Sequence, residues 1–276
     1  MQFHAPAKVN LQLRILGKRF DGFHEIETLM VPLSLADTLT MEKTSSKGLT
    51  FTCNDERLPL DESNLVVKAV KAFQNRTGFG GGISIHLQKS IPHGAGLAGG
   101  SSDAAATLIG LNDLCSSGLR SDELAELAAP IGSDISFFLA RSAAICRGRG
   151  EIVEPVSTLP RIPLLLIKPG FEVPTPWAYQ HWSTSRKVSG FHYAAQEMVW
   201  GELVNDLERP VFEKFLFLGL IKNWLMSQPE TVGTLMSGSG STVFAVLTGE
   251  EAGPELLRRA RGEFGNEFWA WCGMSL

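Results

Sequence analysis

Residues 91–105 contain a glycine-rich segment with the composition of a phosphate-binding loop. A backbone without Cβ atoms can approach a polyanion closely, and a helix that follows adds unpaired N–H donors and the positive end of its dipole. A flexible linker is the alternative, but an apolar strand pattern precedes the segment and an amphipathic helix pattern follows it. We therefore predict a phosphate cradle. Its expected lining residues are Pro92, Gly94, Gly96, Leu97, Gly99, Gly100, Ser101 and Ser102.

Three polar side chains are candidates for catalysis or substrate binding: Lys8, Asn10 and Asp134. Residues 7–16 alternate between apolar and polar side chains, which predicts a strand with Lys8 and Asn10 on the same polar face. Asp134 stands in a Gly-Ser-Asp sequence before an apolar run. Local pattern alone favours ordinary roles, a solvated strand residue for Lys8 and a helix N-cap for Asp134.

The remaining patterns predict strands and helices that do not strictly alternate, which favours an α+β fold. Further strands are expected near 27–35, 38–43, 49–53, 83–87, 164–167 and 243–247, and helices near 62–76, 104–115, 122–129, 195–204, 210–227 and 250–264. Asp61 or Ser63 is the expected N-cap of the first helix, and Ser121 that of the third. The proline-rich stretch 155–163 is the best boundary candidate and predicts domains 1–157 and 158–276.

Composition narrows the class of ligand. The chain has 276 residues, a formal net charge of −4 and four cysteines without metal-site spacing. The charge argues against nucleic acid or an acidic membrane surface as a partner and favours a small phosphorylated ligand held by local donors. We find no secretory signal and no apolar run of about 18 residues. These features predict a cytoplasmic protein with reduced thiols and leave its oligomeric state open between a monomer and a weak dimer.

The glycine loop lacks the Gly-Lys-Ser/Thr ending of a Walker A site, the spacing of a dinucleotide fingerprint and the partner motifs of protein kinases. At three separated places, 5–11, 92–102 and 237–240, the sequence resembles the GHMP small-molecule kinases. The stretches 5–11, 17–19, 21–28 and 132–138 resemble one branch of this superfamily, and the string at 21–28 is specific to that branch. The sequence departs from the branch where Phe23 replaces the usual tyrosine, Ala98 a glycine and Ser136 a proline.

The resemblance implies a two-domain GHMP kinase fold, with a ribosomal-protein-S5-like N-terminal domain and a ferredoxin-like C-terminal domain. It implies ATP and Mg²⁺, and transfer of the γ-phosphoryl group to the 2-hydroxyl of 4-diphosphocytidyl-2-C-methyl-D-erythritol in non-mevalonate isoprenoid precursor synthesis. In that branch Asp134 matches the catalytic base and Lys8 its supporting ammonium. Asn10, Phe23, His24 and Tyr179 match residues that hold the cytidine-bearing substrate, and Lys89 and Asn64 match positions near adenine.

Two further stretches resemble family strings, and two other functions are compatible with the sequence. The turn 237–240 is expected to approach the site with its backbone, and the string 205–208 is expected to give structural support. The magnesium ligands are not predicted. The chain could instead phosphorylate another small alcohol, such as homoserine or mevalonate, or bind a nucleotide without catalysis.

Overall fold

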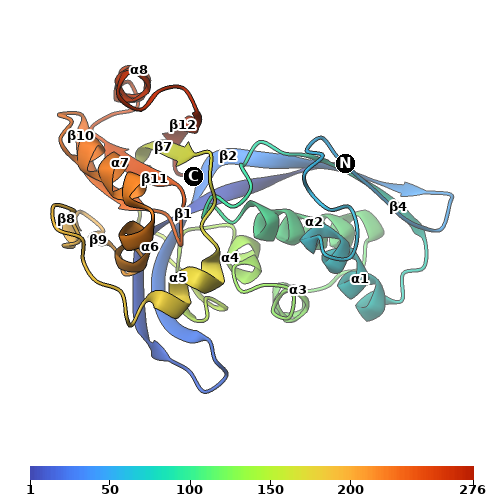
Figure 1. Cartoon of the computed structure of the whole chain (residues 1–276). Coiled ribbons are helices and arrows are strands. Elements are labelled where there is room, and N and C mark those ends of the chain that lie inside the picture. The colour runs from blue at the N-terminus through green and yellow to red at the C-terminus, as the bar shows by residue number, and fades with distance from the viewer.

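The computed structural model describes residues 1–276 and builds its larger sheet around one long antiparallel hairpin (Figure 1). Strand β1 (Gln2–Lys18) pairs with β2 (His24–Thr44) over most of its length. The sheet order is β3-β4-β2-β1-β9-β8, and β5 and β6 add to it at β2. The other strands are β3 (Gly48–Cys53), β4 (Gly82–Gln88), β5 (Ala144–Gly148), β6 (Ile152–Pro155), β8 (Gln196–Met198) and β9 (Gly201–Asn205).

Four helices pack together beside this sheet (Figure 1). They are α1 (Leu65–Thr77), α2 (Gly99–Cys115), α3 (Ser121–Ala128) and α4 (Ile135–Ala140). Their apolar side chains form one core with β2 and β4, in which Phe73, Ile85, Leu108 and Phe137 are buried. This core is a rigid base for the start of α2, where the glycine-rich segment ends.

The second sheet has the order β10-β11-β7-β12 and is antiparallel throughout. Its strands are β7 (Pro163–Pro169), β10 (Thr231–Met236), β11 (Val243–Leu247) and β12 (Phe268–Met274), and the accompanying helices are α5 (Thr175–His181), α6 (Glu208–Lys214), α7 (Leu216–Met226) and α8 (Ala252–Phe264). Figure 1 shows α5 between this half of the chain and the helices of the first half. The predicted α+β organisation is confirmed.

Several local predictions are wrong. Residues 195–204 form no helix but the short antiparallel pair β8 and β9. The helix predicted at 210–227 is divided at Phe215 into α6 and α7. The strands expected at 27–35 and 38–43 are one continuous strand, β2. Strands β5, β6 and β12 were not predicted as such, since their sequences lack clean alternation.

Helix starts also differ from expectation. Asn64 caps α1 and accepts a hydrogen bond from the backbone N–H of Val66, whereas the predicted caps Asp61 and Ser63 lie in the preceding turn. Arg120 occupies the N-cap position of α3, and Ser121 is the first helical residue. Helix α2 begins within the glycine loop at Gly99 and not near residue 104.

The predicted domain division after residue 157 stays a prediction. Strands β8 and β9 follow that residue and still belong to the first sheet, where β9 pairs in parallel with β1. The two halves of the sequence are therefore interlocked around β1. None of the helices has the length and apolar character needed to cross a membrane.

Candidate active site

The glycine-rich segment leads into the start of α2 and leaves no space for a side chain at Gly96. A Cβ atom on Gly96, whose φ is +74°, would lie 2.2 Å from the carbonyl oxygen of Ser237. The backbone N–H of Lys8 donates to the carbonyl of Leu97, which ties the segment to β1. Gly99, Gly100 and Ser101 form the first turn of α2, where backbone N–H groups lack helical partners. This geometry suits a phosphate group.

Lys8 and Asn10 are buried beside this cradle, with exposed fractions of 4% and 3%. The register of β1 against β2 shifts on both sides of them, a bulged geometry that redirects side chains. The Lys8 ammonium donates to Asn10 Oδ1 at 2.7 Å and to the Gly96 carbonyl at 3.1 Å. Asn10 Nδ2 donates to Thr28 Oγ1 at 2.7 Å, which fixes the orientation of the amide.

Asp134 lies beside this lysine and lines the same cavity. Its carboxylate lies 3.8 Å from Lys8 Nζ and is about one-third exposed. Asp134 occupies the N-cap position of α4, but its side chain makes no capping hydrogen bond. Burial lowers the pKa of Lys8, and the Asp134 charge opposes that shift. Burial and the same carboxylate raise the pKa of nearby Cys146 to about 12, so this thiol stays protonated.

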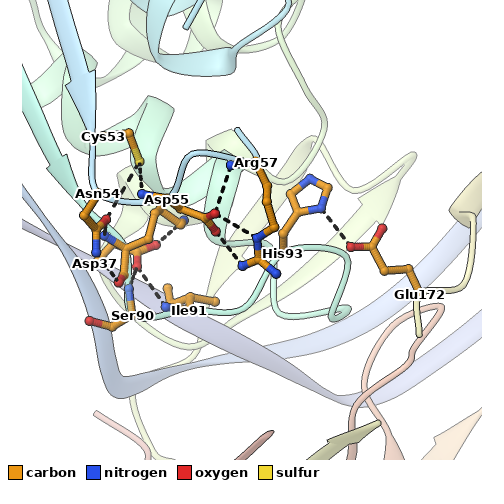
Figure 2. Close-up of polar contacts among 10 residues, drawn as sticks. Asp37, Cys53, Asn54, Asp55, Arg57, Ser90, Ile91, His93 and Glu172 are labelled. Carbon is orange, nitrogen blue, oxygen red and sulfur yellow. Dashed lines mark hydrogen bonds and ion pairs between the residues drawn. The ribbon is translucent and has the colours of Figure 1, made fainter. Parts of the chain in front are cut away.

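An ion-pair cluster anchors the start of the cradle. Asp37 is fully buried and accepts hydrogen bonds from the backbone N–H groups of Ser90 and Ile91, as Figure 2 shows. Lys89 pairs with Asp37 and, at 2.8 Å, with Asp103. Burial and the neighbouring Asp37 charge raise the pKa of Asp103 to about 7, against the opposing effect of Lys89. Lys89 is predicted to lie near adenine, but its ammonium is paired with two protein carboxylates.

Two further charged contacts lie near the glycine loop. His93, in the glycine loop, contacts Glu172 at 3.0 Å, and Arg57 donates to Asp55 (Figure 2). Glu172 precedes α5, so the His93 contact joins the cradle to the second half of the chain. The His93–Glu172 pair is exposed, and pairs of this kind add little stability. Of these four residues only His93 lines the cavity.

Aromatic side chains gather at the opposite end of the cavity. The His24 and Tyr179 rings have centroids 5.3 Å apart, and Trp182 lies edge-on to His24 at 6.0 Å. Phe23 is 52% exposed, and the Arg149 guanidinium lies 4.9 Å from the centre of its ring. Burial and the charge of Lys18 lower the pKa of His24. A neutral imidazole can both donate and accept a hydrogen bond, as a nucleobase edge requires.

One cavity of about 720 Å³ joins these groups, a size typical of small-molecule sites. It is lined by Lys8, Asn10, Phe23, His24, Asn64, Lys89, Pro92, Gly94, Gly96, Gly99, Gly100, Ser101, Asp134 and Tyr179, all of which the sequence singled out. Leu97 and Ser102 do not line it. Leu97 is buried in a core cluster, and Ser102, inside α2 and not at its N-cap, borders a second cavity on another face.

Sequence reasoning missed two charged residues of this cavity, Arg149 and Asp103. Arg149 brings a positive charge to the aromatic end, and its signal was its place between two glycines, 148 and 150. Asp103 lines the other end, and its buried Oδ1 has no hydrogen-bond partner within the protein. It directly follows the two serines of the loop, but a single acidic residue in a helix start is a weak signal.

The cavity offers few protein ligands for a metal ion. No group of three or more His, Cys, Asp or Glu side chains is placed to hold one. Mg²⁺ at a phosphoryl-transfer site is held largely by substrate phosphates and water, with few protein oxygens. The Ser101 hydroxyl at the cradle fits that limited role.

The chain is similar in sequence to the GHMP kinases. A family model described as "GHMP kinases N terminal domain" matches residues 64–141. The 4-diphosphocytidyl-2-C-methyl-D-erythritol kinase of Methylacidiphilum infernorum is 44% identical, over 96% of this chain and 93% of the relative. The kinase of the same name from Protochlamydia amoebophila is 40% identical, over 91% of this chain and 85% of the relative.

Solved structures share the fold over the whole chain. A crystal structure of 4-(cytidine 5'-diphospho)-2C-methyl-D-erythritol kinase superposes with a TM-score of 0.81 at 36% identity, covering 100% of this chain and 99% of that one. Homoserine kinase from Cytophaga hutchinsonii gives a TM-score of 0.71 at 21% identity, covering 100% and 94%. The predicted two-domain GHMP kinase fold is confirmed.

Proposed function

Since the chain belongs to the 4-diphosphocytidyl-2-C-methyl-D-erythritol kinase family, we propose that it phosphorylates the 2-hydroxyl of 4-diphosphocytidyl-2-C-methyl-D-erythritol and forms ADP. Membership of this family makes it an ATP-dependent small-molecule kinase of isoprenoid precursor synthesis. The acceptor, the position of the new phosphate and the roles of individual residues belong to the proposal. The observation that carries it is the placement of Lys8 and Asp134, in one cavity, between the cradle and the aromatic end.

Asp134 is the base in this proposal. The acceptor oxygen forms a bond to the γ-phosphorus, the bond from that phosphorus to the bridging oxygen of ATP breaks, and the hydroxyl proton passes to the Asp134 carboxylate. Two features favour this role. The carboxylate is not used for capping α4, and it lines the cavity with about one-third of its surface exposed.

Lys8 supplies positive charge to the transferred group. Its ammonium is buried, and Asn10 and the Gly96 carbonyl hold it in place. A charge that is oriented before the reaction stabilises developing negative charge without further reorganisation. The lysine lies between Asp134 and the glycine loop, so it can reach both the acceptor oxygen and the phosphoryl oxygens.

The acceptor's cytosine fits the aromatic end. Phe23 and Tyr179 offer faces for stacking, worth about 1–3 kcal/mol per base, and neutral His24 can bond the base edge. Arg149 beside Phe23 offers a cation for the diphosphate. Neither homoserine nor mevalonate carries a base, so neither acceptor would stack on the aromatic side chains at this end of the cavity.

In this proposal the ATP phosphates bind in the cradle, and adenine extends toward Asn64 and Lys89. Asn64 contributes chiefly backbone geometry, since its side chain is occupied as the cap of α1. Magnesium, when bound with the nucleotide, neutralises phosphate charge, and Ser101 is the residue that we expect to contact it. The glycines act through their backbone N–H groups.

The test is ADP release with 4-diphosphocytidyl-2-C-methyl-D-erythritol, homoserine and mevalonate as separate acceptors. We expect turnover of the cytidyl acceptor alone, reduced at least about a hundredfold by Asp134→Asn. Turnover of another alcohol would keep the kinase chemistry and remove the cytosine site. ATP binding without transfer to any acceptor would support a non-catalytic protein. Near-normal rates in a folded Asp134→Asn variant would exclude the carboxylate as the base.

A further inference from the structure

The string 205–208, Asn-Asp-Leu-Glu, lies outside the cavity and yet contacts both β1 and the turn 237–240. Asp206 accepts a hydrogen bond from the backbone N–H of Ile15, and its own N–H donates to the carbonyl of Leu13. Asn205 is in register with Leu13 in the parallel pair of β9 and β1. The string is therefore fixed to the strand that carries Lys8 and Asn10.

Asn205 holds the entry to the turn through both N–H bonds of its amide. Its Nδ2 donates to the carbonyls of Met236 and Gly238, each at 2.7 Å, and its Oδ1 accepts from the N–H of Leu207 at 2.9 Å. The side chain is 4% exposed, so water does not replace these bonds easily. Glu208 holds the other backbone group of Met236, since its Oε1 accepts from the Met236 N–H at 2.9 Å.

The turn in its own right contacts the groups that hold Lys8. The Ser237 hydroxyl donates to the Gly96 carbonyl at 2.9 Å, and the same carbonyl accepts from Lys8 Nζ at 3.1 Å. Gly238 lies beside the same groups, since a Cβ atom there would be 3.4 Å from Lys8 Nζ, an ordinary van der Waals contact. A shift of this turn therefore moves the cradle and the ammonium together.

We propose that Asn205 is a positioning residue for phosphoryl transfer, because it fixes the turn 237–240 against Gly96 and Lys8. This inference rests on the proposed function of the same site. Asn205 does not line the cavity and touches neither substrate. Its effect is transmitted through Met236, Gly238 and the Ser237 hydroxyl. Because those contacts end at Lys8 and the cradle, loss of the amide should impair the transfer step more than substrate binding.

Asn205→Ala leaves the Met236 and Gly238 carbonyls without their donor. We expect kcat per folded molecule to fall at least about tenfold, since misplacement of about 1 Å can cost about a hundredfold. We expect the KM values for ATP and for the acceptor to change less than about threefold. Asn112→Ala is the matched control, because Asn112 also bonds backbone groups, those of Leu119, at the far end of α2.

Ser237→Ala provides the second variant and keeps the test valid if Asn205→Ala does not fold. It removes only the hydroxyl on the Gly96 carbonyl and should lower kcat in the same way. Because both residues act through one turn, the double variant should lose less than the product of the two separate effects. Folding of every variant is checked by circular dichroism and thermal unfolding, and kcat is normalised to folded protein.

The outcomes separate the inference from the proposed function. Reduced kcat in the Asn205 and Ser237 variants, with KM values retained and Asn112→Ala unaffected, supports the positioning role. A kcat within about threefold of wild type in the folded variants, or a loss expressed mainly in KM, overturns it. Wild-type protein that does not phosphorylate the cytidyl acceptor overturns the proposed function and this inference with it.

Discussion

Gly96→Ala tests whether the cradle depends on close approach of its backbone to the turn 237–240. The new Cβ would lie 2.2 Å from the Ser237 carbonyl oxygen and 2.9 Å from that of Gly240. Both neighbours are backbone atoms, so no flexible side chain can move aside. The loop or the turn must shift by most of an ångström to reach an acceptable contact. A displacement of this size at the reacting groups predicts a loss of about a hundredfold in kcat.

The backbone conformation adds a separate cost, which Gly118→Ala measures. Both glycines are left-handed, with φ of +74° and +67°, but a Cβ on Gly118 meets nothing within 4 Å. Each substitution should lower the free energy of unfolding by roughly 1–2 kcal/mol from the left-handed conformation alone. Any additional loss in the free energy of unfolding of Gly96→Ala measures the steric clash of the new Cβ with the Ser237 and Gly240 carbonyl oxygens.

The assay combines steady-state ADP release with urea unfolding of both variants. We expect Gly118→Ala to retain kcat within about twofold while losing stability. A Gly96→Ala variant whose kcat stays within about threefold of wild type would refute the claim that close backbone contact at this glycine positions the site. Equal stability losses in the two variants would refute the predicted clash.

Three further predictions concern charged groups. Lys222→Met should destabilise the protein by about 3–5 kcal/mol in urea unfolding, because it leaves the buried Glu208 carboxylate unpaired; a loss below about 1 kcal/mol would contradict this. Arg149→Ala should raise the KM for the acceptor about tenfold with kcat nearly retained, and an unchanged KM would remove Arg149 from the diphosphate contact. Because burial lowers the pKa of Lys8, its ammonium deprotonates below the pH expected for an ordinary lysine. We therefore expect kcat to fall with rising pH before the pH at which an ordinary lysine deprotonates. The same profile is expected for Cys146→Ala, since the pKa of that thiol is about 12. A kcat that stays constant over this range would contradict the role of the ammonium.

Features encoded by nearby residues were predicted well from the sequence. The alternation at 7–16 identified β1, and the glycine-rich segment identified the loop that opens α2. Period-two patterns and glycines with special backbone needs express local geometry directly. The resemblance to GHMP kinases then selected Lys8 and Asp134, for which local pattern had favoured ordinary roles.

Features set by distant contacts were predicted poorly. The pair β8 and β9 replaces a predicted helix because Gly201 has φ of +117° and the Gln196 side chain bonds both backbone groups of Thr234 in β10. Lys89 looks like a free surface cation in the sequence, but it is buried between Asp37 and Asp103. No local pattern reports which carboxylates a fold will bring to a lysine.

The most direct test of the account is identification of the product by ³¹P and ¹³C NMR after incubation of the protein with ATP, Mg²⁺ and 4-diphosphocytidyl-2-C-methyl-D-erythritol. The account predicts one new phosphomonoester, coupled to the tertiary carbon that bears the 2-hydroxyl, with one ADP formed for each product molecule. A phosphate on another oxygen, or ADP formed without a phosphorylated acceptor, would contradict the proposed alignment of Asp134, Lys8 and the acceptor.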